Sequence, residues 1–192
     1  KGLRLDLRMS AGVLSTDSQR KVTLVSMPYT LNLKKSGFAF AMEAGVSRDL
    51  SHSDKLAITP RASLRYESLG FGPAVERGGP MALSIQHGAR EALEGRLGLG
   101  LAGQSGKVRP HLDVNYVHDF VTMVPGITAG FVGGIATMPL SLAARDANWA
   151  EVSGGLTFEL SGRAALSVEA DSSLFRKDLR SQSYRGRLTL KF

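Results

Sequence analysis

The sequence predicts an all-β protein, an antiparallel up-and-down transmembrane β-barrel of about 10–12 strands, as found in bacterial outer membranes. Three observations lead to this fold class. Apolar and polar residues alternate along most of the chain. The alternating segments reach the ~9–11 residues that a tilted strand needs to cross a bilayer. The bulk composition is nevertheless that of a soluble protein, as expected where an apolar belt encloses a polar interior.

Composition sets the first limits. The chain has 192 residues, of which 43% are hydrophobic and 21% charged, and it contains no cysteine. No linker or low-complexity tract divides it, so we expect one outer-membrane β-barrel domain over residues 1–192. The missing cysteines exclude disulfides and thiolate metal sites. The net charge of +7 suggests nucleic acid, but the basic residues are spread along the alternating segments, and we expect no nucleic-acid partner.

The first alternating segment, residues 3–13, shows the two faces clearly. Leucine, methionine, alanine and valine fall on one face, and Arg4, Asp6, Arg8 and Ser10 fall on the other. Residues 56–67 and 184–192 repeat the pattern. Turn residues separate about eleven such strands, at 2–14, 20–34, 37–49, 55–68, 80–90, 95–103, 107–120, 127–140, 148–160, 163–174 and 181–192.

Two other folds compete with the barrel. A soluble β-sandwich or lipocalin-like barrel also alternates, but it buries large aromatics, and its strands are typically ~5–6 residues long. A membrane-spanning helix is the second alternative, because residues 120–144 contain no charge. Pro125, Pro139 and four glycines in this stretch argue against the helix.

A search for chemistry predicts no enzyme, no cofactor and no metal site. The histidines at 52, 87, 111 and 118 have no metal-ligand spacing, and no nucleophile elbow or phosphate loop opens a helix. Arg109, His111, Asp113 and Asn115 share one side of a strand. They are interpreted as a hydrogen-bonded polar lining rather than as a catalytic cluster.

Charges inside a narrow barrel are partly desolvated and need partners, so we expect the lumen-facing charges to pair. Glu43 is predicted opposite Arg61, and Glu169 opposite Arg185. The positive surplus would favour anions or acidic parts of a threaded chain. The predicted lumen-facing charges are Arg4, Arg8, Glu43, Arg61, Arg65, Glu67, Arg109, Asp113, Glu169, Asp171, Arg185 and Arg187. Tyr66 and Tyr184 at the outer ends and Phe192 at the inner end fit aromatic girdles.

The order of several loose motifs resembles one family. A strand with Pro60, Leu64 and Tyr66 is followed by a glycine-rich loop that leads into Glu76 and Gly78–Gly79. Next come a Leu-Gly-Leu-Gly run at 97–100, a strand with Pro110 and His118, Gly154–Gly155–Leu156, and a last strand ending in Phe192. Over residues 54–192 this order resembles the β-barrel translocator domain of autotransporters, the type V secretion proteins.

The resemblance implies an outer-membrane location and a twelve-stranded barrel that anchors and exports an N-terminal passenger, with a helix in the lumen ahead of the first strand. It also implies outer-membrane lipid, lipopolysaccharide and the barrel-assembly machinery as partners. Tyr184, Leu188, Leu190 and Phe192 would form the assembly signal. The alternative is a structural barrel subunit or small pore without a passenger.

The strand count leads to one further expectation. With Phe192 in the periplasm, counting strands backwards puts Lys1 at the extracellular end of the first strand. An odd number of strands leaves one missing, to be supplied by sequence outside this chain or by a partner chain. If 95–103 or 127–140 is not a separate strand, the alternative is a closed ten-stranded barrel. Since residue 1 is Lys, either a signal peptide has been removed or the chain is a fragment.

Overall fold

The structure, a computed structural model, describes residues 2–53, 55–142 and 144–190, with the backbone alone at 51–53. These residues form thirteen strands, β1 to β13, in two antiparallel sheets. The all-β, antiparallel fold class predicted from the sequence is confirmed. In the described part of the chain, no helix is long and apolar enough to cross a membrane.

The larger sheet has nine strands. Eight follow one another in the order β1-β2-β4-β7-β8-β11-β12-β13, and β3 pairs with β4 off this path. Each neighbour on the path is also the next long strand in sequence, which is the up-and-down topology expected of a barrel. The strands are β1 Leu3–Leu24, β2 Met27–Arg48, β3 Leu50–Ser53, β4 Leu56–Phe71, β7 Arg90–Gly103, β8 Val108–Asp119, β11 Asn148–Ser161, β12 Ala164–Leu174 and β13 Gln182–Leu190.

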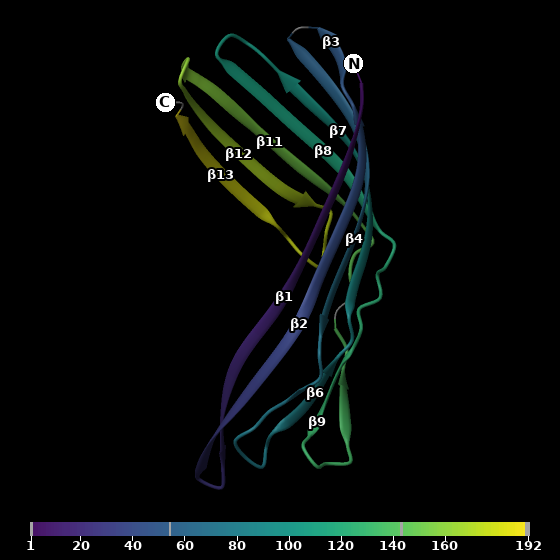
Figure 1. Ribbon diagram of the computed structural model, residues 1–192, viewed down its shortest axis with the longest axis vertical. Helices are drawn as coiled ribbons and strands as arrows, with labels where there is room; N and C mark the ends of the chain where they lie inside the picture. The colour runs from purple at the N-terminus through teal and green to yellow at the C-terminus, as the bar shows by residue number, and fades with distance from the viewer. Residues whose placement is uncertain (1, 54, 143, 191–192) are drawn as a thin grey trace.

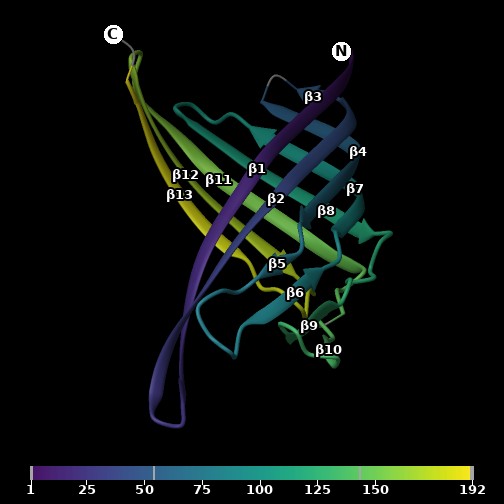
Figure 2. The same ribbon diagram turned by 60° about the horizontal axis from the view of Figure 1, so that its bottom comes forward.

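The smaller sheet is built from the two longest connections, residues 72–89 and 120–147. Its strands pair in the order β10-β9-β6-β5, and they are β5 Ala74–Val75, β6 Leu83–His87, β9 Ile127–Phe131 and β10 Thr137–Leu140. It lies at the end of the large sheet away from both termini (Figure 2). The segment predicted as a strand at 127–140 is therefore a short hairpin outside the large sheet, and the helix alternative for this stretch is wrong.

Both ends of the chain lie at the same end of the large sheet (Figure 1). The short turns at 104–107 and 162–163 share that end with the termini, and the β1–β2 hairpin tip lies at the opposite end. If short turns are periplasmic and long loops extracellular, as in outer-membrane barrels, the start of β1 would lie on the periplasmic side. The strand count put Lys1 at the opposite end from Phe192. Both residues lie outside the described part of the chain, but the start of β1 and the end of β13 share one end, so the expectation is wrong for these two strands.

This error came from the first hairpin. β1 and β2 are each 22 residues long and pair without interruption from Leu3 with Arg48 to Leu24 with Met27. The turns predicted at 15–18 and 35–37 do not exist, because the polar residues there pair across the hairpin, as Ser15 does with Ser36. The two strands extend past the rest of the sheet (Figure 1), and polar residues are tolerated on both of their faces.

A second merger involves β7. The sequence predicted separate strands at 80–90 and 95–103. In the structure, residues 90–103 form the single strand β7, and residues 83–87 form β6 of the small sheet. With these two changes, and with residues 127–140 in the small sheet, eight strands lie on the path of the large sheet instead of about eleven. Because eight is an even number, the argument that an odd number of strands leaves one strand missing no longer applies. The closed ten-stranded alternative is not found either, because no ladder in the described residues joins β1 to β13.

The register gives the large sheet one charged and one apolar face, since directly opposed residues share a face. Arg4 pairs with Ser47, Ser47 with Arg61, Arg61 with Gly98, and the row continues through Asn115 to Glu151. The predicted opposition of Glu169 and Arg185 is confirmed. That of Glu43 and Arg61 is wrong: Glu43 lies opposite Arg65 on the same face, because the turn is centred two residues away from the assumed position.

Burial is concentrated outside the middle of the sheet. Leu31 and Leu33 of β2 are buried where the hairpin extends toward the long loops, together with Ala74 and Ala82. A backbone bridge between Asn32 and Arg77 ties the loop to β2 there. The outer part of the first hairpin and the loop at 72–82 therefore stabilise each other.

The tip of the β1–β2 hairpin carries local strain. Val25 and Ser26 both have positive φ, 47° and 66°. This is the conformation of a type I′ turn, which favours Asn-Gly, and a β-branched residue is poorly suited to it. We expect V25N/S26G to stabilise the tip by about 1 kcal/mol. Proteinase K applied to intact cells should then cut between residues 20 and 30 about fivefold more slowly.

The matched control is V25A, which removes the β-branch but keeps a non-glycine residue at positive φ. Its effect should be smaller than that of V25N/S26G. Equal cleavage of the double variant and the unaltered protein would show that the tip is not strained in this way.

Candidate functional site: the charged face and its outer mouth

The charged face of the large sheet is concave, as its ion pairs show. Arg61 of β4 pairs with Asp113 of β8, although β7 lies between these strands. Arg96 of β7 reaches over β8 in the same way, to 3.6 Å from Glu151 of β11. Curvature of the sheet toward this face brings such side chains closer together, and the face also contains a hollow lined by residues from β1 to β11. In a barrel, the concave face is the one that lines the lumen.

Two glycines of β7 make room for the Arg61–Asp113 pair. A Cβ at Gly98 would overlap Oδ1 of Asn115 and lie 3.0 Å from Cγ of Arg61. A Cβ at Gly100 would overlap a terminal nitrogen of Arg61. The Leu-Gly-Leu-Gly run at 97–100 therefore has a physical role, because its leucines lie on the apolar face and its glycines let an arginine cross the strand.

All of the charged residues predicted for the lumen lie on this face by register. Most of their partners are exposed, so each pair contributes little. Arg4 pairs with Asp49 at 3.2 Å, Arg185 with Asp171 at 3.1 Å, and Arg109 with Glu159. Asp49 was missed from the sequence because it lies at the end of a strand, where alternation gives no signal. Glu159 continues the polar side of β11 after Thr157, so alternation could have assigned it to this face.

The residues from 109 to 115 that share one side of β8 do not form a common cluster. Arg109 pairs with Glu159, Asp113 pairs with Arg61, and His111 lies 3.9 Å from Glu169. Their partners lie on three different strands, β11, β4 and β12. This separation is the arrangement of a polar lining, in which partners are distributed over the wall.

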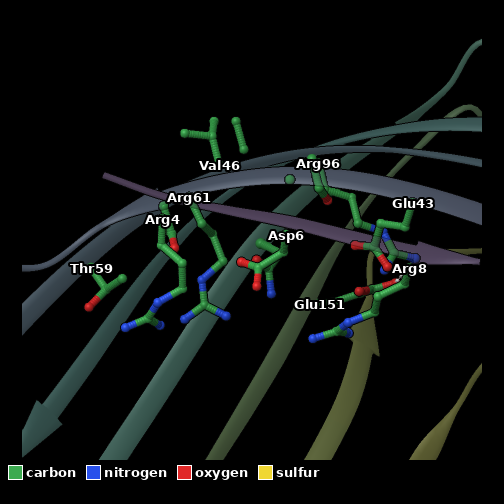
Figure 3. A pocket seen from close by; sticks show the side chains of 14 residues that line it. Arg4, Asp6, Arg8, Glu43, Val46, Thr59, Arg61, Arg96 and Glu151 are labelled. Carbon is green, nitrogen blue, oxygen red and sulfur yellow. Dashed lines mark ion pairs between the residues drawn. The ribbon is translucent and has the colours of Figure 1, made fainter. Parts of the chain in front are cut away.

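A hollow of 370 Å³ lies on the charged face between β1 and β11. Arg4, Arg8 and Arg61 extend into it together with Asp6 and Glu43, whereas Val46 points to the other side of the sheet (Figure 3). Guanidinium groups and carboxylates from five strands share this space, and β8 adds the Asn115 amide. A wall of alternating charge can contact a polypeptide backbone and its charged side chains without a single dedicated pocket.

The extracellular end of the charged face carries a denser group, here called the mouth cluster: Glu94, Asp119, Arg145, Trp149 and Arg176. Asp119 is 1% exposed and Trp149 is 2% exposed. Arg145, from the loop that precedes β11, lies 2.7 Å from Asp119 and 3.9 Å from Glu94. Asp119 also accepts backbone N–H groups of Leu93 and Val121 through its other oxygen.

A second loop closes over the mouth cluster from the other side. Arg176, from the β12–β13 connection, lies over the Trp149 ring at 4.2 Å and pairs with Asp178 at 2.8 Å. The hydrogen bond from Arg176 holds the pKa of Asp178 below its usual range. Asp146 accepts the backbone N–H groups of Lys177 and Asp178, which joins the two loops.

The loop at 72–82 is fixed to the first hairpin by a further ion pair. Arg20 donates two hydrogen bonds to Glu76, at 3.1 and 2.6 Å, and the Glu76 carboxylate also accepts the N–H of Leu83. The hydrogen bond with Arg20 lowers the pKa of the buried Glu76 carboxyl. Neither this pair nor the mouth cluster could be predicted from the sequence, because long loops have no periodic signal.

The predicted assembly-signal residues lie on the last strand. Tyr184, Leu188 and Leu190 of β13 lie on the apolar face and are strongly exposed, Tyr184 to 79%. Phe192 lies outside the described residues. The structure thus places three of the four side chains in an exposed row at the edge of the sheet, where another protein or lipid can contact them.

The mouth cluster should depend on Arg145. Removing one partner of a buried ion pair leaves an uncompensated charge, at a cost of about 3–5 kcal/mol. We expect R145A to release both loops, seen as faster hydrogen–deuterium exchange at residues 144–150 and 175–181. R109A, which breaks an exposed pair on the same face, is the matched control and should cost about 0–1 kcal/mol. Similar exchange in both variants would show that the mouth cluster does not hold the loops.

A family model described as the autotransporter beta-domain matches residues 1–171. A search of curated proteins found no match. The family match covers most of the chain and agrees with the up-and-down sheet, its one apolar face and the short turns that share one of its ends. The chain therefore belongs to the autotransporter β-domain family and is a translocator domain of the Gram-negative outer membrane, with a transmembrane β-barrel fold.

Proposed function

We propose that this domain anchors an N-terminal passenger in the outer membrane and serves as the path by which the passenger reaches the cell surface. The observation that carries this proposal is the continuous charged, concave face, whose register runs from Arg4 on β1 to Glu151 on β11. An extended chain passing along such a wall meets donors and acceptors throughout. The proposed role requires no catalysis by this domain.

The charge of the wall supports an unfolded polypeptide as cargo. Arginines and carboxylates alternate along it, so a passing chain finds weak exposed contacts rather than one deep site. Transit through a pore requires binding that is favourable enough to enter and weak enough to leave. A surplus of guanidinium groups favours the acidic parts of the cargo.

The mouth cluster favours a second candidate, a structural barrel or small pore without a passenger. Loops tied across the outer end by Arg145 and Arg176 would restrict passage. For the translocator, the same cluster would have to open during export or form only after it.

We further infer that β1 and β13 are paired by strands other than those described. Each has one edge without a ladder in the described part of the chain. Unpaired backbone N–H and C=O groups in lipid cost several kcal/mol each, so open edges are not tolerated there. The strands come either from the same polypeptide or from a partner chain.

The proposal is tested in the full-length protein by an epitope placed directly upstream of residue 1. Export predicts that antibody added to intact cells binds the epitope. A barrel without a passenger predicts that the epitope is detected only after the outer membrane is broken. The second outcome would overturn the proposal, and a reading frame with a signal peptide directly before residue 1 would do so independently.

The charged wall can be tested in the same cells. Arg8 and Arg187 form no ion pair with the described residues, so R8Q/R187Q lowers the positive charge without orphaning a carboxylate. Surface exposure of the epitope should slow severalfold. R163Q, in the turn between β11 and β12, is the matched control and should have no effect.

The last strand is proposed to be read by the barrel-assembly machinery, through Tyr184, Leu188, Leu190 and Phe192. Deleting Phe192 alone removes one apolar side chain, which by itself would leave a barrel that still assembles. An assembly signal predicts a much larger loss of heat-modifiable, folded protein in the outer membrane. Normal assembly of the deletion variant would contradict the signal. Replacing Leu166, an apolar-face residue of the neighbouring strand, with Ala is the control.

A further inference from the structure

The apolar face of the large sheet contains a groove of 570 Å³. Its floor consists of the small residues Ala44, Ala62 and Gly95, from three neighbouring strands. Its walls include Leu64, Leu97 and Phe120. Small and large residues alternate across the strands here, since Ala44 pairs with Leu64 and Leu64 with Gly95. The groove is thus a consequence of sequence and register together.

The aromatic side of the groove is fixed before any ligand arrives. Tyr116 donates a hydrogen bond to Oδ1 of Asn148, and Nδ1 of His118 lies 2.8 Å from the same oxygen. The His118 and Phe120 rings contact edge to face at 4.6 Å between centroids. Phe120 lies over Gly95, where an added Cβ would come within 3.0 Å of the ring. A preformed wall lowers the entropy cost of binding.

The groove lies in the half of the membrane face nearer the long loops. His118 and Phe120 are at the end of β8 that leads into the connection at 120–147. Tyr66, whose hydroxyl donates to Glu91 at 2.9 Å, marks the polar boundary beyond it. Because long loops are extracellular in outer-membrane barrels, this half faces the outer leaflet.

We propose that this groove is a binding site for one acyl chain of an outer-leaflet lipid. The surface around it is the lipid-contacting face of a transmembrane barrel, so hydrocarbon is the surrounding medium. The groove is open along the face of the sheet, which suits a chain that lies along the surface rather than a compact, enclosed ligand. Leu64, Leu97, Tyr116 and Phe120 are 49–63% exposed, and a chain in the groove covers all four. The site does not depend on passenger export.

The test uses full-length protein in phosphatidylcholine vesicles that contain a small fraction of phosphatidylcholine with a diazirine in one acyl chain. After illumination, adducts are mapped by mass spectrometry. We expect labelling of Leu64, Leu97 and Phe120 to exceed that of Val168 and Leu188 by about fivefold. The last two residues lie on the same face with similar exposure, 51% and 59%. Equal labelling of the two sets would overturn the proposal, whatever any variant does.

Two filling variants and one control sharpen the result. A62F and A44L fill the floor with apolar atoms and should reduce groove labelling to the level of Leu188. A170F adds the same ring to the apolar face of β12, away from the groove, and should leave labelling unchanged. Groove labelling that persists in both folded filling variants would overturn the proposal. Dimers joined through groove peptides by a separately added bifunctional crosslinker would do so as well, since they would identify a second copy as the occupant.

Discussion

The constraint on which this structure depends is that one pleated sheet separates two different media. Every backbone N–H and C=O group in lipid must be paired, and every side chain of a strand faces either lipid or the interior. Alternation in sequence therefore becomes two chemically distinct faces. Leu5 and Leu7 lie on one side of β1 and Arg4, Asp6 and Arg8 on the other. A single inserted residue would exchange these faces along the rest of the strand.

Curvature then determines which charges meet. The direct neighbours of Arg61 across the strands are Ser47 and Gly98, and neither carries a charge. On the concave face it pairs with Asp113 across β7, and this geometry requires glycine at positions 98 and 100. The glycines weaken the strand intrinsically, since they lose more conformational entropy on folding. Their presence in β7 is explained by the ion pair that crosses them and by the leucines that alternate with them.

The sequence predicts what depends on local periodicity and misses what depends on tertiary contacts. The faces of β8, β11, β12 and β13 follow from alternation, and so does the opposition of Glu169 and Arg185. The first hairpin does not, because its turn at Val25–Ser26 has no turn signature while Ser15–Ser18 has one. The start of the first strand was therefore placed at the wrong end. The register of Glu43 failed separately, because the turn between β2 and β4 is centred two residues beyond the assumed position. Asp49 and Glu94 were missed because they lie at or just outside the ends of the predicted strands, and Arg145 because it lies in a long loop.

The uncharged stretch at 120–144 shows how the loops obtain their structure without periodicity. β9 pairs with both β6 and β10, so the backbone of this stretch is satisfied by the other long loop rather than by a helix. Many of its apolar side chains remain exposed, Ile135 and Met138 among them, so burial does not hold it. Its ends supply the order. Asp119 accepts two backbone N–H groups at one end, and Arg145 returns to Asp119 at the other. The ion pair between Arg145 and Asp119 thus joins the two ends of this loop. Whether the loop stays in place over the end of the charged face therefore depends on that pair.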